Sequence, residues 1–232
     1  MASEIKQGTL ELVNHLPILQ VITPMLIAPI LVVLNNKTLS WLLSFLGALA
    51  CLFISILLIQ AVSDGSILTY YLGGWVPPIG IEYRIDAANA ILLFLISIIS
   101  AIVLIFSYSS LHAEIPEEKH TLFYSCFLLC LTGLLGVVAT ADIFNVFVFL
   151  EISSLSTYVL VAQGAYLDRR ALSASFNYLI MGTIGATFFV IGIGYIYMAT
   201  GSLNMMDIAE RVSQLGDNKT IDIEEISTGS LG

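Results

Sequence analysis

Residues 121–164 read TLFYSCFLLCLTGLLGVVATADIFNVFVFLEISSLSTYVLVAQG and form two long apolar runs joined by a very short connection. The first run ends at Ala139 and the second begins at Asp142. Each run is close to the roughly 20 apolar residues that a helix needs to cross a bilayer. Lipid offers no hydrogen-bond partners to the backbone, and the runs lack the alternation of barrel strands, so helices are expected. The stretch therefore predicts a tight antiparallel pair of membrane-spanning helices.

The composition of the whole chain agrees with a membrane protein. Of the 232 residues, 58% are hydrophobic and 11% are charged, and the mean hydropathy is +0.95. A soluble domain is about 45–50% apolar and about 25% charged, so a soluble enzyme domain and a disordered chain are excluded. A nucleic-acid binder would need a basic face, whereas the net charge is −9. Cys51, Cys126 and Cys130 lie in apolar runs without a nearby His, which indicates packing residues and no metal site.

The sequence predicts an all-α polytopic membrane protein with about six transmembrane helices in residues 1–200. A span is expected wherever about 20 mostly apolar residues follow one another. The connection over residues 63–86 is rich in Tyr, Trp, Gly and Pro, as is typical of a membrane interface. An amphipathic surface helix is expected at residues 201–216 and an acidic tail or linker at residues 217–232. The six predicted spans are approximately residues 16–34, 39–62, 87–108, 121–139, 142–164 and 171–199.

The basic residues give a weak preference for one orientation. Each side of the predicted bundle carries four of them, so only closeness to helix ends and loop length separate the sides. We expect both termini outside the cell and the cytoplasm on the side of Lys37, Lys119, Arg169 and Arg170. No cleavable signal peptide is expected, because the first 15 residues are polar.

Glu151 is the outstanding candidate for function. It lies nine residues into the fifth predicted span, about 13 Å along the helix axis and so near the middle of the bilayer. An ionisable group at that depth costs from about 2.5 kcal/mol upward, so it indicates a functional site by default. Tyr158 shares its helix face, and several Ser and Thr residues lie nearby. The alternative is a Glu that only bonds to a neighbouring helix.

Five other polar residues are weaker candidates for ion movement, each with a structural alternative. Asp142 and Asn145 begin the fifth span, where Asp142 can simply cap the helix, as Asp86 can for the third. Asn177 lies inside the sixth span and could bond to another helix or hydrate a path. His112 and His120 flank an acidic loop and could collect protons, or they could lie in an ordinary solvated loop.

The order and spacing of three stretches resemble a known family. They are GLLGVVATADIFNVFVFLEISSLSTYVLVA at residues 133–162, YLGGWVPPIGI at residues 71–81 followed by Asp86, and ALSASFNYLIMGTIGATFFVIGIGYIYMATGSLNMMD at residues 171–207. They are similar to the antiporter-like subunits of Mrp cation/proton antiporters, complex I and membrane-bound hydrogenases. The resemblance covers most of residues 70–207.

The resemblance implies specific roles. Glu151 falls on the family's essential fifth-helix glutamate, which takes part in moving protons along a polar axis in the membrane, and Asp142 and Asn145 match an Asp–x–Phe–Asn pattern. The family fold has fourteen helices with two inverted repeats, and this chain matches helices one to six. Asn177 stands where many relatives have Lys, and the sequence ends before the seventh helix that carries the lysine partner. A natural split subunit and the N-terminal part of a longer product both remain open.

The sequence therefore predicts an antiporter-like subunit that contributes to proton translocation, with Na⁺ as an alternative coupling ion. It would work in a redox-driven assembly or an Mrp-type antiporter in a prokaryotic plasma membrane, beside other integral membrane subunits and without nucleic acid. We expect no catalytic site and no cofactor in this chain, whereas partner subunits could hold iron–sulfur or nickel–iron centres. The alternative function is a non-conducting structural subunit that lacks the second half of the ion path.

Overall fold

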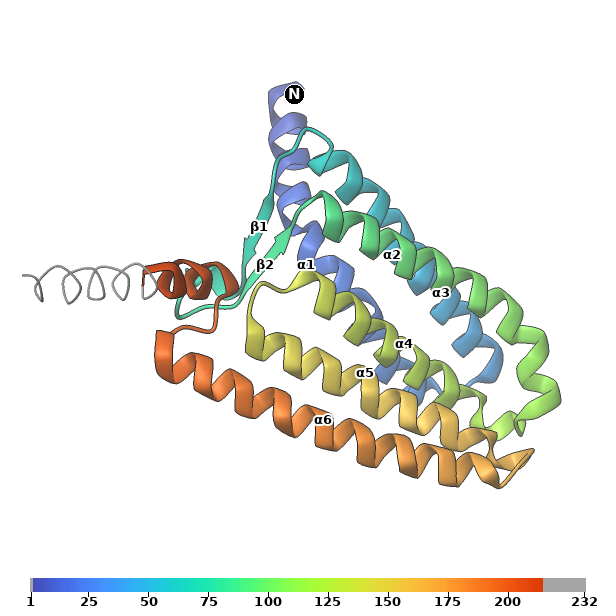
Figure 1. The fold of residues 1–232 in the computed structure, drawn as a ribbon. Coiled ribbons are helices and arrows are strands. Elements are labelled where there is room, and N and C mark those ends of the chain that lie inside the picture. The colour runs from blue at the N-terminus through green and yellow to red at the C-terminus, as the bar shows by residue number, and fades with distance from the viewer. Residues whose placement is uncertain (1, 215–232) are drawn as a thin grey trace, which may run out of the picture.

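The computed structural model describes the backbone of residues 2–214 and the side chains of residues 14–214. Six long helices run side by side between two ends of the molecule (Figure 1). All six are long and apolar enough to cross a membrane, so the predicted polytopic helical fold is confirmed. The helices are α1 (Ala2–Leu34), α2 (Lys37–Val62), α3 (Ala87–Glu114), α4 (His120–Ala139), α5 (Ile143–Gln163) and α6 (Arg170–Thr200).

Two helix boundaries differ from the predicted spans by more than two residues. α1 begins at Ala2 because a polar helical stretch precedes its apolar part, which starts at Asn14. α3 continues past Tyr108 to Glu114, so His112 lies in its last turn. Both differences have one cause: an apolar run marks only the part of a helix that fits the bilayer, and a helix can extend beyond it in polar residues.

The helix starts follow local rules that the sequence already contained. The side chain of Asp86 accepts a hydrogen bond from the Asn89 N–H at 2.9 Å and caps α3. Asp142 caps α5 in the same way, accepting from the Asn145 N–H at 2.7 Å. A capping side chain satisfies one of the free N–H groups in the first helical turn. The capping alternatives for both residues are therefore confirmed.

The long connection between α2 and α3 folds as a small hairpin. Strands β1 (Leu68–Tyr71) and β2 (Glu82–Ile85) pair antiparallel, and a short helical turn, η1 (Leu72–Gly74), begins the loop between them. Gly73 and Gly74 have φ of 65° and 77°, a backbone conformation that glycine adopts without strain. The hairpin lies at the helix ends beside α1 (Figure 1).

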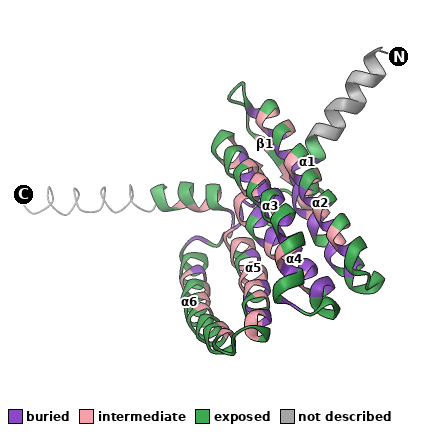
Figure 2. Ribbon diagram, turned by 90° about the vertical axis from the view of Figure 1, so that its right-hand side faces the viewer, coloured by how far each residue is buried: buried purple, intermediate pink, exposed green. Residues whose placement is uncertain are grey.

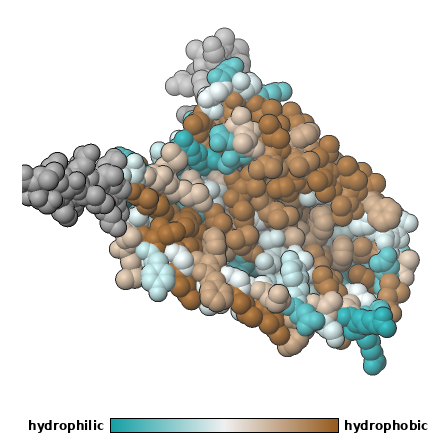
Figure 3. Space-filling model, in the orientation of Figure 1, coloured by the Kyte–Doolittle hydropathy of each residue, from teal (hydrophilic) through white to brown (hydrophobic). Residues whose placement is uncertain are grey.

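The core lies between α1, α2, α3 and α4, and α6 is peripheral. The main helix pairs are α4 with α5, α1 with α4, α2 with α3, α1 with α2, and α5 with α6. Figure 2 shows purple residues concentrated in the first four helices and mainly green ones along α6. Of the 18 most apolar consecutive residues of α6, 6% are buried, compared with 56% for α4. On the face in Figure 3, brown side chains dominate the middle and teal ones gather towards the ends, as expected for a protein in lipid.

Residues 205–214 are helical after a short link from α6, and they extend away from the helix ends (Figure 1). The Asn204 side chain accepts from the N–H groups of Met206 and Asp207, at 3.0 and 3.2 Å, and so caps this helix. The side chains of Met205, Met206 and Val212 are exposed. The predicted tail at residues 217–232, and the end of the predicted surface helix, lie outside the described residues.

Candidate functional site

Glu151 lies midway along α5, beside a groove between α5 and α6. The groove has a volume of about 260 Å³. The side chain is half-buried, so the predicted burial of Glu151 is only partial in this chain. Among residues 14–214, the side chain of Glu151 makes no hydrogen bond and no ion pair. The residues that line the groove are Phe147, Leu150, Glu151 and Ser154 of α5, and Gly182, Gly185, Ala186 and Phe189 of α6.

The groove exists because α6 offers small residues opposite Glu151. Gly182, Gly185 and Ala186 carry at most one side-chain carbon, while Phe147 and Phe189 supply bulk around them. A side chain built at Gly185 would meet nothing within 4 Å, which shows how open this part of the seam is. The arrangement leaves space at the depth where a carboxyl group needs water or a cation to be charged.

Asp142 and Asn145 lie at the end of α5, in a different environment from Glu151. Asp142 is 8% exposed, and the Asn145 side chain donates to the Thr140 hydroxyl at 3.1 Å. Burial raises the pKa of Asp142, and hydrogen bonds from the backbone of Asn145 and Phe144 oppose that rise. Nine helical positions separate Asp142 from Glu151, about 13 Å. The structure therefore does not bring these two carboxyl groups together.

Three buried polar residues near Asp142 were missed by the sequence reasoning. The Asn204 side chain donates to Glu82 at 2.7 Å, and both residues are at most 5% exposed. Burial raises the pKa of Tyr83 to about 12, opposed by a hydrogen bond from Asn145. The backbone joins the same segments, since the Ala141 N–H donates to the Glu82 carbonyl at 2.9 Å. No local pattern could have found this junction, because Glu82 and Asn204 are 122 residues apart.

Tyr158 and Asn177, the other two candidates within the spans, have opposite surroundings. Tyr158 is 6% exposed, and its ring packs edge-on against Tyr178 with centroids 4.9 Å apart. Its hydroxyl lies against Gly182, one of the residues that line the groove of Glu151. Asn177 is exposed on the outer side of α6 and has no hydrogen-bond partner among residues 14–214. The structure therefore brings Tyr158 to the groove and leaves Asn177 outside it.

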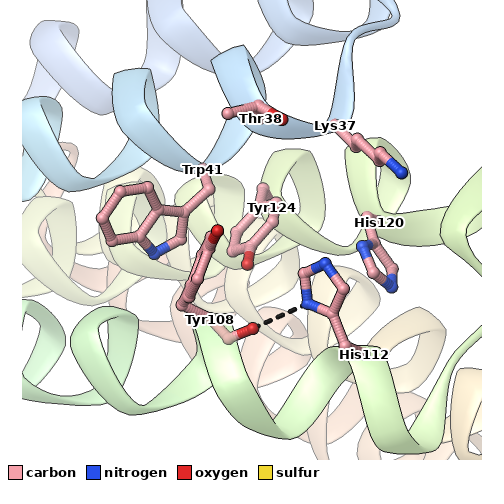
Figure 4. A pocket seen from close by; sticks show the side chains of 7 residues that line it. All are labelled: Lys37, Thr38, Trp41, Tyr108, His112, His120 and Tyr124. Atoms are coloured by element: carbon pink, nitrogen blue, oxygen red, sulfur yellow. Dashed lines mark hydrogen bonds between the residues drawn. The ribbon is translucent and has the colours of Figure 1, made fainter.

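His112 and His120 line a separate cavity of about 20 Å³ at the end of the bundle opposite Asp142, where α3 leads into α4 (Figure 4). Their rings meet edge-on with centroids 4.9 Å apart. His112 Nδ1 donates to the Tyr108 carbonyl at 2.8 Å and His120 Nε2 to the Ile115 carbonyl at 3.0 Å. His120 is 1% exposed, so the solvated-loop alternative is wrong for this residue. The remaining lining residues are Lys37, Thr38, Trp41, Tyr108 and Tyr124, none of them from α5 or α6.

Within the described residues, no group of three or more His, Cys, Asp or Glu side chains is arranged to hold a metal ion. The loop at the end of the His cavity is held by an ion pair between Lys37 and Glu117. Away from the helix ends, Glu151 is the one carboxyl group within the described spans, and Ser and Thr hydroxyl groups lie on the same helix.

Known proteins that are similar to this chain include subunits of NADH:quinone oxidoreductases, antiporters and an archaeal respiratory complex. The family described as "NADH:quinone oxidoreductase/Mrp antiporter, TM" matches residues 140–227. NADH-quinone oxidoreductase subunit N of Desulforudis audaxviator is 39% identical over 210 residues, which are 89% of this chain and 41% of that protein. A Na(+)/H(+) antiporter subunit of Alkalihalophilus pseudofirmus is 29% identical over 211 residues, 90% of this chain and 42% of that protein.

A solved structure shares both the fold and part of the sequence. A chain of the membrane-bound sulfane sulfur reductase, an archaeal respiratory membrane complex, superposes with a TM-score of 0.77 at 34% identity. The match covers 84% of this chain and 39% of that chain. The chain therefore spans about two fifths of the length of the relatives that it matches.

Proposed function

Because this chain belongs to the antiporter-like membrane subunit family shared by NADH:quinone oxidoreductases and Mrp antiporters, we propose that it takes part in proton translocation. It is a multi-pass protein of the plasma membrane. In this proposal it works beside other integral membrane subunits, and Na⁺ is the alternative coupling ion. The observation that carries the proposal is the position of Glu151, half-buried in an open groove midway along a membrane-spanning helix.

Glu151 would accept a proton in the groove and release it when a positive charge approaches. An approaching cation attracts the carboxylate form electrostatically, which would drive this release. No cationic side chain lines the groove among the described residues, so in this proposal the approaching charge comes from another chain or segment. The energy would come from a redox reaction at iron–sulfur or nickel–iron centres of partner subunits, or from an opposing cation gradient.

The other candidate residues have secondary roles in this proposal. Asp142 and Asn145 fix the start of α5 and so the position of Glu151 along the bilayer normal. Asn177 would act only where a neighbouring chain covers α6, because it is exposed here. His112 and His120 would collect protons at the end of the bundle where α3 leads into α4.

Replacing Glu151 with Gln tests the proposal. The substitution keeps the size of the side chain and its ability to hydrogen-bond, but an amide cannot gain and lose a proton as a carboxyl group does. In membrane vesicles that contain the assembled complex, we expect Glu151→Gln to abolish proton movement while the complex still assembles. The exposed carboxylate Glu210 provides a matched control, and Glu210→Gln should transport normally.

A Glu151→Gln complex that assembles and transports as well as the natural one would refute the proposal. In that case the chain would be a structural subunit that positions its neighbours without conducting ions. The partner list of the purified complex separates the two proposed settings. Iron–sulfur or nickel–iron subunits would indicate a redox-driven complex, and small Mrp-type membrane subunits would indicate an antiporter.

A further inference from the structure

The hydroxyl groups of α5 differ in whether they have a hydrogen-bond partner, and that of Ser153 pairs with the Cys130 sulfur of α4 at 3.6 Å. The hydroxyls of Ser156 and Thr157 donate to carbonyl oxygens one turn earlier, at 2.7 and 2.8 Å. Such bonds are the usual way to satisfy Ser and Thr in a helix. The hydroxyls of Ser154 and Tyr158 have no hydrogen-bond partner among residues 14–214. These two groups are therefore available to water or to a proton.

The two free hydroxyls lie along the seam between α5 and α6, together with Glu151. Ser154 lines the same groove as Glu151. The Tyr158 ring is buried, and a Cβ atom added at Gly182 would lie 1.9 Å from its hydroxyl oxygen. Gly182 also lines the groove, so the Tyr158 hydroxyl meets the groove's wall.

The direction of the Tyr158 side chain shortens its distance from Glu151. The two residues are seven positions apart on α5, about 10 Å along the axis. Side chains on a helix tilt towards its N-terminus, and Glu151 lies on that side of Tyr158; both side chains tilt this way, but the longer Tyr158 reaches further. The contact with Gly182 agrees with this direction, since Gly182 faces Glu151 across the groove.

We infer that Ser154 and Tyr158 form a hydroxyl relay that passes protons to Glu151 along the groove between α5 and α6. In each passage the Tyr158 oxygen gives its proton to one water molecule in the groove and takes a proton from another, so the phenol returns to its neutral form. The proton then reaches the Glu151 carboxylate through water held at Ser154. The groove of about 260 Å³ has room for several water molecules. This inference rests on the proposed role of Glu151.

The relay differs from a path through the histidines. His112 and His120 share their cavity with side chains of α2, α3 and α4, and no lining residue comes from α5 or α6. The Tyr158 path lies on the same helix as Glu151 and in the same groove. The arrangement therefore assigns proton delivery to the α5–α6 seam.

Tyr158→Phe is the direct test, because it removes only the hydroxyl oxygen. In vesicles that contain the assembled complex, we expect the initial rate of proton movement to fall about tenfold or more. We also expect the slowing caused by exchanging H2O for D2O to increase, since proton delivery becomes rate-limiting. A purely structural role for Tyr158 would change the amount of complex and leave this isotope effect unaltered.

The glycines of α6 provide a second test that does not touch Tyr158. Gly182→Ala places a methyl group on the Tyr158 hydroxyl and should slow transport similarly, whereas Gly192→Ala meets nothing within 4 Å and should not. The double variant Tyr158→Phe/Gly182→Ala should be no slower than Tyr158→Phe alone. Without the hydroxyl, the nearest ring atom is Cζ at 3.0 Å, a contact that a small ring shift relieves.

The outcomes separate this inference from the proposed function. A Tyr158→Phe complex with normal rate and isotope effect would overturn the relay, while loss of transport in Glu151→Gln would still support the role of Glu151. Equal effects of Gly182→Ala and Gly192→Ala would also contradict the relay. If Glu151→Gln changes nothing, the proposed function and the relay both fail.

Discussion

At the scale of single residues, Asp142 combines a structural role with a titratable charge. It caps α5 and is buried, and burial raises its pKa against the opposing backbone hydrogen bonds from Asn145 and Phe144. The folded protein therefore holds a proton on Asp142 more tightly than the unfolded chain does. Between the usual and the raised pKa the folded state binds more protons, so the free energy of unfolding falls as the pH rises through that window.

Two substitutions separate the cap of Asp142 from its charge. Asn caps a helix about as well as Asp, so Asp142→Asn should keep the cap and flatten this part of the pH dependence. Asp142→Ala should lose the cap and cost about 1 kcal/mol. The measurement is the midpoint of thermal unfolding in detergent between about pH 4 and pH 7. The same slope in Asp142→Asn and in the natural protein would show that Asp142 does not titrate there.

At the scale of helices, α5 packs tightly against α4 on one side and loosely against α6 on the other. A Cβ atom at Gly133 would lie 2.6 Å from the Phe149 carbonyl oxygen and 2.7 Å from the Ser153 nitrogen. At Gly136 it would meet the Phe149 ring at 2.3 to 2.5 Å. Two glycines one turn apart thus allow the backbones of α4 and α5 to touch, as small residues do between membrane helices.

The two glycines should respond differently to Ala. Gly133→Ala meets backbone, which cannot move without separating the helices, so it should cost stability at the upper end of the roughly 1–3 kcal/mol typical of overpacking. Gly136→Ala meets a side chain, and adding Phe149→Leu should restore part of the loss. Thermal unfolding in detergent measures both, with Gly194→Ala on the open face of α6 as the control. Equal losses at residues 133 and 194 would contradict the tight seam.

Sequence patterns predicted the elements well because these depend on neighbours in the chain. The apolar runs predicted six spans, and Asp86 and Asp142 were candidates for caps from their positions alone. The hairpin of β1 and β2 was missed, since its pairing of Leu68 with Ile85 depends on contacts across the loop. The partial exposure of Glu151 was missed for a similar reason, because it depends on glycines that lie some thirty residues away on α6.

At the scale of the whole molecule, the chain has one covered and one uncovered side. α1 to α4 bury a continuous set of apolar side chains, whereas α6 packs mainly against α5 and exposes most of its surface (Figure 2). Large exposed side chains on α6 include Phe176, Met181, Phe188, Tyr195 and Met198. The relatives that this chain matches are more than twice its length.

Amide hydrogen exchange should report this asymmetry. In the isolated chain in detergent, we expect peptides from α6 to exchange faster than peptides from α4, because local opening is easiest where few contacts hold an element. In the native membrane complex, α6 should gain more protection than α4 does. Equal protection of α6 in the two preparations would mean that no other segment or chain covers its outer face.

The difference between the tight α4–α5 contact and the loose α5–α6 contact also determines which helix can move. With backbone atoms of α4 and α5 in contact at Gly133, we expect those two helices to move together. The Glu151 groove lies on the opposite, loosely filled side of α5. Any mechanical strain that accompanies a change of charge on Glu151 would therefore be absorbed by tilting α6. Such a tilt would carry the turn between α5 and α6 with it.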